Sequence, residues 1–306
     1  MFITASFLAI FRENSSKLML TPTPVLLAGG LNIVKARMKS VGSIRKITKA
    51  MKMVAASKLR HDERRLLNGI PFAAPAINLF ARLPVEKVTG ITSDTYLGLT
   101  SDKGLCGGVN SAVGRAIRSK IVESEAAGRS AKYFGVGGKG TSGLRRLYGD
   151  RFIGTIEDVQ KVGWNFITAS AIAERVLASD PQTLTMIHNH FKSAIAYDTR
   201  RVKLVTKHQV KNLDKAEWSK AIDPYSFEPS VHEVWDDLHE FYLASTIFGS
   251  MLDNISAEQS ARMSAMDSAS KNAGEMLSKL TLQYNKARQA KITTELCEII
   301  SGATAL

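Results

Sequence analysis

Two glycine-rich turns are the first places where this sequence could do chemistry. The run 135–140, Gly-Val-Gly-Gly-Lys-Gly, has the glycine spacing of a dinucleotide-binding turn, whose backbone N–H groups cradle phosphates. Its first glycine lies inside the expected strand, and the acids about twenty residues further on, Glu157 and Asp158, are poorly placed to bind a ribose. Lys139 is followed by Gly140 rather than by Ser or Thr, so the run is not a P-loop. A tight strand-to-helix turn is the favoured interpretation.

The other reactive side chains form no catalytic or metal-binding set. Cys106, in the second glycine-rich turn 101–108, has no His near it in sequence to activate it as a nucleophile. His188 and His190 alternate on one expected strand face, which permits metal binding, but no third ligand is evident. The acids between Asp236 and Glu240 suit a helix N-terminus better than an acid/base pair. We therefore predict no catalytic residue, no cofactor site and no metal site.

Length and composition exclude several classes of protein. The 306 residues are 44% hydrophobic, which is enough for one large domain or two modest ones with buried cores. The two cysteines, Cys106 and Cys297, lie far apart, which is typical of a reducing compartment and gives no zinc-ligand spacing. No stretch approaches the roughly 18 to 20 consecutive apolar residues of a membrane-spanning helix. We expect a protein that is soluble or peripheral to a membrane.

Two long helical segments bracket the chain and would position many of its charged side chains. From residue 31 to 68, apolar residues recur at spacings of three and four, which predicts an amphipathic helix about 55 Å long. The stripe consists of Val34, Met38, Val41, Ile44, Ile47, Met51, Val54, Leu59 and Leu66. Gly69, followed by Pro71 and Pro75, predicts the end of this helix, because glycine caps helix C-termini and proline lacks the N–H that a helix needs.

The C-terminal segment 233–306 predicts a longer helix still. It contains no proline and three glycines, and at 1.5 Å per residue it could reach roughly 105 Å. A helix of that length exceeds a globular core, so most of it must pair with another long helix or pass through a partner. Gln259 and Arg262 interrupt its apolar stripe, which predicts a weak coiled coil whose other faces meet something else. The simpler alternative for either helix is the core face of a helical bundle.

Most of the net charge of +13 lies on the first helix. Residues 31–67 contain eleven basic and two acidic residues, a net charge of +9, and residues 276–294 contain four basic residues and no acid. Because the bases are spread over about ten helical turns without interleaved aromatic residues, acidic protein surfaces are favoured over nucleic acid as partners. A solvated basic face is the simpler alternative. The uncharged end, residues 299–306, is expected to lie in an apolar collar.

Between residues 91 and 232, short β-rich runs alternate with helical stretches. The runs 95–100, 132–136 and 152–156 are each followed by a helical pattern, and two closing strands are expected at 184–190 and 194–208. Such alternation predicts β-α units and a mostly parallel sheet. The predicted fold is α/β: a long antiparallel coiled coil of the N- and C-terminal helices plus a central Rossmann-like α/β domain at 91–232, with a connector at 69–90.

Residues 1–30 differ in composition from the rest of the chain. They are rich in apolar residues, Ser and Thr, with Arg12 and Lys17 against a single acid, Glu13. The apolar stretch 2–11 precedes the basic residues, which is the reverse of the order in a secretory signal. We interpret the segment as a mitochondrial targeting segment, with a disordered extension as the alternative.

Together these segments resemble the gamma subunit of F-type ATP synthases, the central rotor shaft of the catalytic head. The resemblance lies in the motifs at 38–41, 47–58, 101–107, 258–263, 284–296 and 300–303. It covers the chain from about residue 31 onward, and the motifs at the two ends are the most specific.

The resemblance implies a subunit without catalytic groups of its own. In that family the two end helices form an asymmetric coiled coil inside a ring of three alpha and three beta subunits, and rotation changes the affinity of each beta subunit for ADP, phosphate and ATP. The middle domain adjoins the delta/epsilon central-stalk subunits and the membrane c-ring. The implied location is the matrix side of the mitochondrial inner membrane, peripheral to it, because the cysteine-pair insertion of chloroplast members is absent. A bacterial origin remains open if residues 1–30 are not cleaved.

Matching positions identify candidate partner contacts. Met51 matches a shaft residue of the family that lies near an acidic segment of a beta subunit, called its lever. Three further positions match residues that hydrogen-bond to the catalytic head: Arg262, Gln289 and Thr293. The charge pattern adds four bases expected to face acidic levers: Lys49, Lys52, Lys286 and Arg288.

Two other hypotheses stay open. A nucleotide-binding α/β enzyme would need a glycine fingerprint with an acid partner and a catalytic cluster. A basic nucleic-acid binder would show salt-sensitive retention on DNA.

Overall fold

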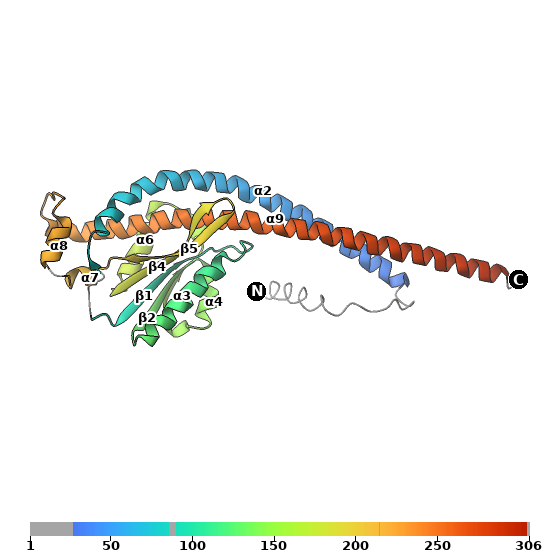
Figure 1. The fold of residues 1–306 in the computed structure, drawn as a ribbon, viewed down its shortest axis with the longest axis horizontal. Helices are drawn as coiled ribbons and strands as arrows, with labels where there is room; N and C mark the ends of the chain where they lie inside the picture. The colour runs from blue at the N-terminus through green and yellow to red at the C-terminus, as the bar shows by residue number, and fades with distance from the viewer. Residues whose placement is uncertain (1–26, 86–89, 214, 305–306) are drawn as a thin grey trace. The chain divides into compact units, whose positions relative to one another are not determined.

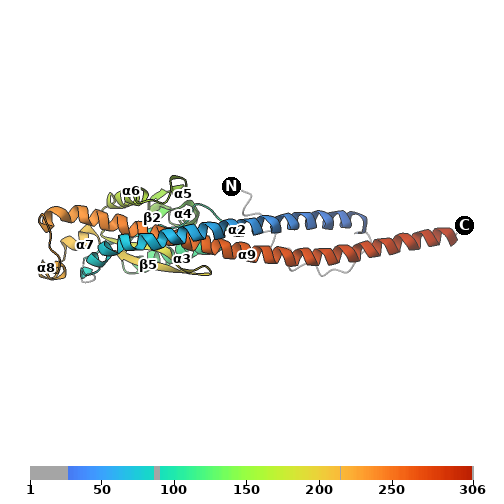
Figure 2. The same cartoon turned by 90° about the horizontal axis from the view of Figure 1, so that it is seen from above.

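The computed structural model describes residues 27–85, 90–213 and 215–304, so residues 1–26 of the predicted targeting segment lie outside it. The chain divides into two compact units. Among the described residues, one unit comprises residues 27–47 and 269–304, and the other comprises those between 48 and 268. Two long helices contribute residues to both units, α2 (Leu27–Phe80) and α9 (Val231–Thr304), and Figure 2 labels both.

A five-stranded sheet forms the centre of the unit 48–268 (Figure 1). Its strands are β1 (Ser93–Leu99), β2 (Ser130–Val136), β3 (Phe152–Ile156), β4 (Thr183–Ser193) and β5 (Ala196–Leu204), in the order β3-β2-β1-β4-β5. Strands β1 to β4 are parallel, and β5 is antiparallel to β4. Parallel neighbours need crossover connections, whereas β4 and β5 form a hairpin. The predicted mostly parallel sheet is confirmed.

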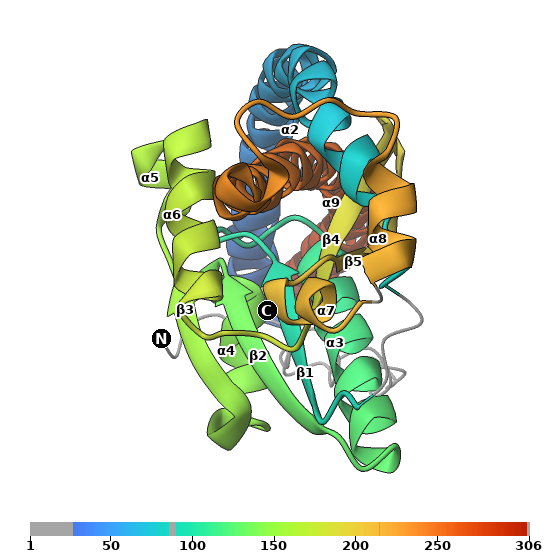
Figure 3. The same ribbon diagram turned by 90° about the vertical axis from the view of Figure 1, so that its left-hand side faces the viewer.

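Helices cover both faces of this sheet (Figure 3). α3 (Val109–Ala126) and α4 (Gly138–Arg145) pack on one face, and α6 (Phe166–Leu177) and α9 pack on the other. Alternating side chains divide accordingly, because Tyr96 joins the core beneath α3 and Leu97 joins the core beneath α9. Four shorter helices complete the unit: η3 (Gly149–Arg151), α5 (Val159–Val162), α7 (Lys207–Lys211) and α8 (Lys215–Ile222).

Within the unit 48–268, α2 and α9 run antiparallel. Residue numbers rise along α2 as they fall along α9, as three contacts show: Lys52 with Asp267, Ala73 with Gly249, and Phe80 with Tyr242. The last pair is a stacked ring contact with centroids 4.0 Å apart. The predicted antiparallel pairing of the terminal helices therefore holds in this unit.

The predicted end of the first helix is wrong. α2 continues through Pro71 and Pro75 to Phe80, so the predicted connector 69–90 is helical over its first part. Gly69 is not a cap, because a methyl group on its Cα would lie 2.5 Å from Cδ1 of Leu252 on α9. Glycine is needed there for close helix packing. Each proline removes a backbone hydrogen bond, but complete burial of Phe80 in the core keeps the last turns attached, so tertiary packing outweighs the local stop signal.

The other unit contains the N-terminal part of α2 and the C-terminal part of α9. There the guanidinium of Arg45 lies beside Gly274, within 3.5 Å of where a methyl group would stand. The apolar stripe predicted on α9 includes five residues of this unit. Ala273 is buried, and the other four are half-buried between mostly exposed positions: Met276, Leu280, Tyr284 and Ala287.

Candidate functional site

The glycine-rich turn at 135–140 is filled by the chain's own groups. Gly137 has φ +91°, and a methyl group there would lie 2.3 Å from the carbonyl oxygen of Thr100. At the N-terminus of α4, the Gly138 N–H donates to Oδ1 of Asp102 at 3.0 Å. This carboxylate stands where a phosphate would bind at a helix N-terminus. The arrangement agrees with a tight turn and leaves the dinucleotide hypothesis without its anion site.

His188 and His190 meet a single carboxylate. Nδ1 of His190 lies 2.6 Å from Oδ2 of Asp253, and Nε2 of His188 lies 3.5 Å from the same oxygen. The Phe191 N–H donates to Oδ1 of Asp253 at 2.8 Å. Burial raises the pKa of Asp253, but the hydrogen bonds from His188, Phe191 and His190 outweigh it, so the pKa lies below its ordinary value. These contacts tie β4 to α9.

No metal-binding set is formed by the residues that the structure describes. They contain no group of three or more His, Cys, Asp or Glu side chains placed to hold a metal ion.

The Asp236–Glu240 acids lie near the start of α9, where Asp236 and Glu240 contact Lys207 at 3.1 and 3.4 Å. These ion pairs fit the structural interpretation of the acidic cluster.

The second glycine-rich turn, 101–108, is bound by α9. Arg262 donates from Nη2 to the carbonyl oxygen of Gly104 at 3.4 Å and to Oε1 of Glu258 at 2.5 Å. Burial raises the pKa of Glu258, while the charge of Arg262 opposes this. Burial likewise raises the pKa of the Cys106 thiol, which makes the reactive thiolate less available. Arg262 is thus engaged within the chain, with only 11% of its side chain exposed.

Three candidate contact residues lie together on α2. Lys49 is exposed, and Met51 is half-buried. Nζ of Lys52 lies 2.7 Å from Oδ1 of Asp267 on α9, and its side chain remains 43% exposed. Lys49 therefore offers its charge to solvent, whereas Lys52 also helps to hold the helix pair.

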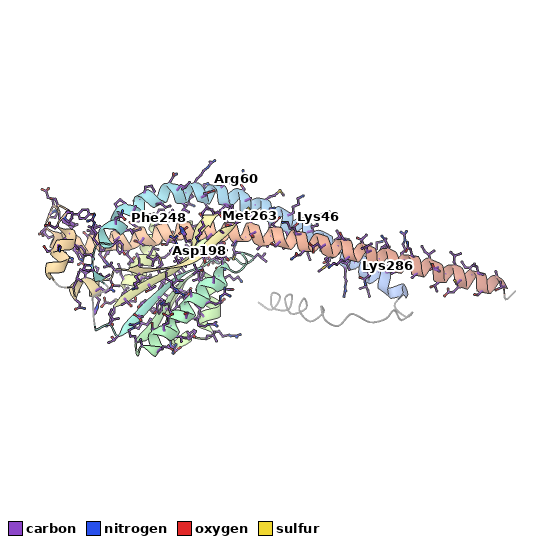
Figure 4. The ribbon with its side chains drawn as sticks, viewed as in Figure 1. Lys46, Arg60, Asp198, Phe248, Met263 and Lys286 are labelled. Carbon is purple, nitrogen blue, oxygen red and sulfur yellow. The ribbon has the colours of Figure 1, made fainter. Side chains whose placement is uncertain are left out.

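The other four candidate contacts lie on the C-terminal part of α9, where Figure 4 labels Lys286. All four are exposed: Lys286, Arg288, Gln289 and Thr293. The hydroxyl of Thr293 donates to the Gln289 carbonyl of the same helix at 2.9 Å. The neighbouring pair of Lys291 and Glu295, 3.5 Å apart, is also within the helix. Exposed pairs of this kind contribute little to stability, so this surface is chemically available to a partner.

Comparison with known proteins decides the family. A protein-family model described as ATP synthase matches residues 30–306. The chain is 39% identical over 281 residues to the mitochondrial ATP synthase subunit gamma of Drosophila melanogaster, covering 90% of each chain. It is 36% identical over 278 residues to the mitochondrial ATP synthase F(1) complex subunit gamma of Rattus norvegicus, covering 90% of this chain and 99% of the relative. The chain belongs to the gamma subunit family of ATP synthases.

Chains in two solved structures of mitochondrial ATP synthases share this fold. A chain in the cryo-EM structure of the Tetrahymena thermophila mitochondrial ATP synthase central stalk and c-ring is 34% identical, with a TM-score of 0.61, and covers 73% of this chain and 99% of that one. A chain of the Euglena gracilis mitochondrial ATP synthase has a TM-score of 0.74 at 19% identity, covering 90% and 94%, which shows the fold alone. The predicted central-stalk gamma subunit of mitochondrial type is confirmed. No described helix of this gamma-family chain is long and apolar enough to cross a membrane.

The gamma-family chain also exposes apolar side chains on α2, including members of the predicted apolar stripe. Val54, on the predicted inner stripe, is 57% exposed, and Met53 is 61% exposed, whereas Ala55 is buried at 1%. Small residues lie where α2 and α9 approach closely, at Gly69 beside Leu252 and at Ala73 beside Gly249. The seven-residue spacing of Thr48 and Ala55, both buried, is the signal that could have located the buried side of α2. Four more exposed apolar residues follow on α2: Leu67, Ile70, Phe72 and Ile77.

Proposed function

We propose that this chain is the rotating central shaft of a mitochondrial F-type ATP synthase and carries no catalytic group of its own. The observation that supports this most directly is the end of α9, where residues 292–304 are all exposed. Four large apolar side chains contribute to this surface at 46 to 69% exposure: Ile292, Leu296, Ile299 and Ile300. A contiguous apolar surface of this kind marks a site that a partner covers.

The alpha and beta subunits of the catalytic head are the proposed cover for this helix end. The delta/epsilon central-stalk subunits and the membrane c-ring are the proposed neighbours of the α/β domain, in keeping with the central stalk and c-ring named for the Tetrahymena structure. The proposed location is the matrix side of the mitochondrial inner membrane, peripheral to it. Nucleic acid is not among the proposed partners.

The proposed shaft acts by binding the conformations of each beta subunit differently. A subunit that touches no substrate changes catalysis only through such differential affinity. Exposed bases at Lys49, Lys286 and Arg288 would attract acidic segments and set their orientation, which is the main contribution of charge at such interfaces. Met51, Gln289 and Thr293 would add apolar and hydrogen-bonding contacts. Lys52 and Arg262 would act from within their internal ion pairs.

A charge-reversing double variant tests the torque contacts. Lys286→Glu with Arg288→Glu should lower ATP synthesis by the reconstituted synthase, because both side chains are exposed and would repel acidic levers. The matched control is Lys286→Arg with Arg288→Lys, which keeps both charges and should retain most of the activity. Unchanged ATP synthesis in the charge-reversed variant would show that the charges of Lys286 and Arg288 are not needed for these contacts.

Assembly and catalysis are tested separately. The chain should co-purify with alpha and beta subunits in a fixed proportion of one to three to three, and the purified chain alone should not hydrolyse ATP. Turnover by the isolated chain would overturn the non-catalytic assignment, and a chain that purifies without those subunits would overturn the shaft itself.

A further inference from the structure

Four phenylalanines from three helices meet near the surface of the unit 48–268, where Figure 4 labels Phe248. Phe72 of α2 contacts Phe166 of α6 and two residues of α9, Phe241 and Phe248, with ring centroids 5.3 to 6.1 Å apart and interplanar angles of 73 to 89°. Edge-to-face rings hold one another in defined positions. Phe72 and Phe241 are nevertheless 44% and 42% exposed, so a rigid aromatic surface faces outward.

A groove of about 690 Å³ adjoins this cluster between α6 and α9, which lie side by side in Figure 3. Phe166 and Phe241 line it together with Ala173 and Ala244, which are buried at 3% and 4% exposure. Ile167, at 78% exposure, stands on its edge. Two helices with alanines between them leave room for the side chains of a third helix. The 12 residues of α6 would support about three turns of such a helix, roughly 18 Å.

Two carboxylates line the same groove in a chain whose net charge is +13. Glu174 comes from α6 and Glu240 from α9. Glu240 lies 3.4 Å from Lys207, and Lys207 lies closer to Asp236 at 3.1 Å. The groove therefore carries acidic side chains on a chain that is basic as a whole, and this favours a basic occupant.

We propose that the groove between α6 and α9 binds a basic amphipathic helix of another subunit in the assembly. Apolar side chains spaced three and four residues apart would pack on Phe166, Phe241 and Ile167, while Lys or Arg on the flanks would reach Glu174 and Glu240. The carboxylates disfavour an anionic lipid headgroup. The inference rests on the proposed function only in requiring that the chain work within an assembly.

Site-specific photocrosslinking in the purified synthase tests the occupant. Ile167→p-benzoylphenylalanine places the crosslinker on an exposed position, where substitution should be tolerated. After irradiation, mass spectrometry should identify one linked segment that is helical, amphipathic and rich in Lys or Arg and belongs to a different subunit. The control is Ile195→p-benzoylphenylalanine, an 82% exposed position outside the groove, which should not link to that segment. A link to a second copy of this chain, to lipid or to an acidic segment, or no link, overturns the proposal.

Charge reversal in the crosslinking chain tests recognition. Glu174→Lys with Glu240→Lys should lower the crosslink yield at least about fivefold, because two attractive contacts become repulsive. Glu63→Lys with Asp223→Lys reverses two exposed acids outside the groove and should change the yield less than about twofold. Equal losses in the two double variants would overturn charge recognition. Failure of the shaft proposal is distinguishable, because the chain would then not co-purify with the synthase at all.

Discussion

Two stretches of the same helix carry polar residues in opposite ways. Between residues 253 and 262, α9 buries polar side chains, and several of them bond to other elements: Asp253 to His190, Asn254 to Asn189, Ser260 to the Ala194 carbonyl and Arg262 to the Gly104 carbonyl. Between residues 286 and 304, the side-chain hydrogen bonds and the ion pair are made within α9 itself, and the surface is almost entirely exposed.

The two stretches of α9 therefore have different roles, one in folding and the other in binding a partner. A buried polar group is tolerated when its hydrogen bonds are satisfied, and leaving one unsatisfied costs the full desolvation penalty. The buried stretch therefore fixes α9 to the sheet with defined geometry. An exposed polar group gains little from contacts within its own helix, so the second stretch contributes little to folding and remains open to a partner. Substitutions should accordingly affect stability in the first stretch and function of the assembly in the second.

The largest expected effect is loss of the carboxylate at Asp253. Asp253→Ala leaves His190 and the Phe191 N–H without their acceptor in a buried setting, and should lower the free energy of unfolding by about 3 kcal/mol. Urea denaturation of the full chain measures it. Glu295→Ala, in the exposed stretch, is the control and should change stability by less than about 0.5 kcal/mol. Similar losses of stability in both variants would contradict the different roles of the two stretches.

The pH dependence of the same site has a definite sign. The folded-state pKa of Asp253 lies below its ordinary value, so this carboxyl stabilises the fold above the unfolded pKa near 3.9, and the stabilisation is lost as pH falls through the folded pKa. Asp253→Asn should therefore be less stable than the unsubstituted chain at pH 6, and the gap should shrink below about pH 4. Denaturation curves at several pH values measure it. A gap that widens on acidification would show that another group controls the site.

A smaller effect is expected where α2 and α9 meet at partly exposed side chains. Lys52 and Asp267 are 2.7 Å apart, with side chains 43% and 33% exposed, so solvent screens most of their attraction. Lys52→Ala should lower the free energy of unfolding by about 0.5 kcal/mol, and high salt should weaken the difference. A loss as large as that of Asp253→Ala would place this pair among the anchoring contacts instead.

The sheet could be predicted closely because its strands are short, β-rich and separated by turn residues. The predicted run 152–156 coincides with β3, and the alternation of strands and helices correctly gave a mostly parallel sheet. The short helices α5 and α7, of four and five residues, were missed because they span too few turns to show a periodic stripe. The predicted end of α2 was wrong because glycine at position 69 makes room for Leu252 of α9 rather than ending the helix. Leu252 is remote in sequence, so the local pattern does not show this contact.

The candidate contact residues likewise differ in how far the sequence could predict their surroundings. Lys286, Arg288, Gln289 and Thr293 are exposed, and their role as partner contacts stays a prediction. Arg262 matched the family pattern equally well, yet it bonds to Glu258 one turn away and to the turn at Gly104. Sequence position alone does not distinguish a base that faces a partner from one that holds its own domain, since that depends on which loop the fold brings beside it.

The smallest effect on stability, and the most specific test of the exposed stretch, concerns Thr293. Its hydroxyl donates to the Gln289 carbonyl, and the hydroxyl of Thr294 donates to the Ala290 carbonyl in the same way, at 2.9 and 3.0 Å. Thr293→Val and Thr294→Val should each change the free energy of unfolding by less than about 0.5 kcal/mol. In the assembled synthase, Thr293→Val should lower ATP synthesis about threefold to tenfold, the equivalent of one hydrogen bond to a partner. Thr294→Val, on a different side of the helix by about 100°, should leave synthesis nearly unchanged. Equal loss from both variants would assign the effect to the helix itself rather than to a contact made by one face.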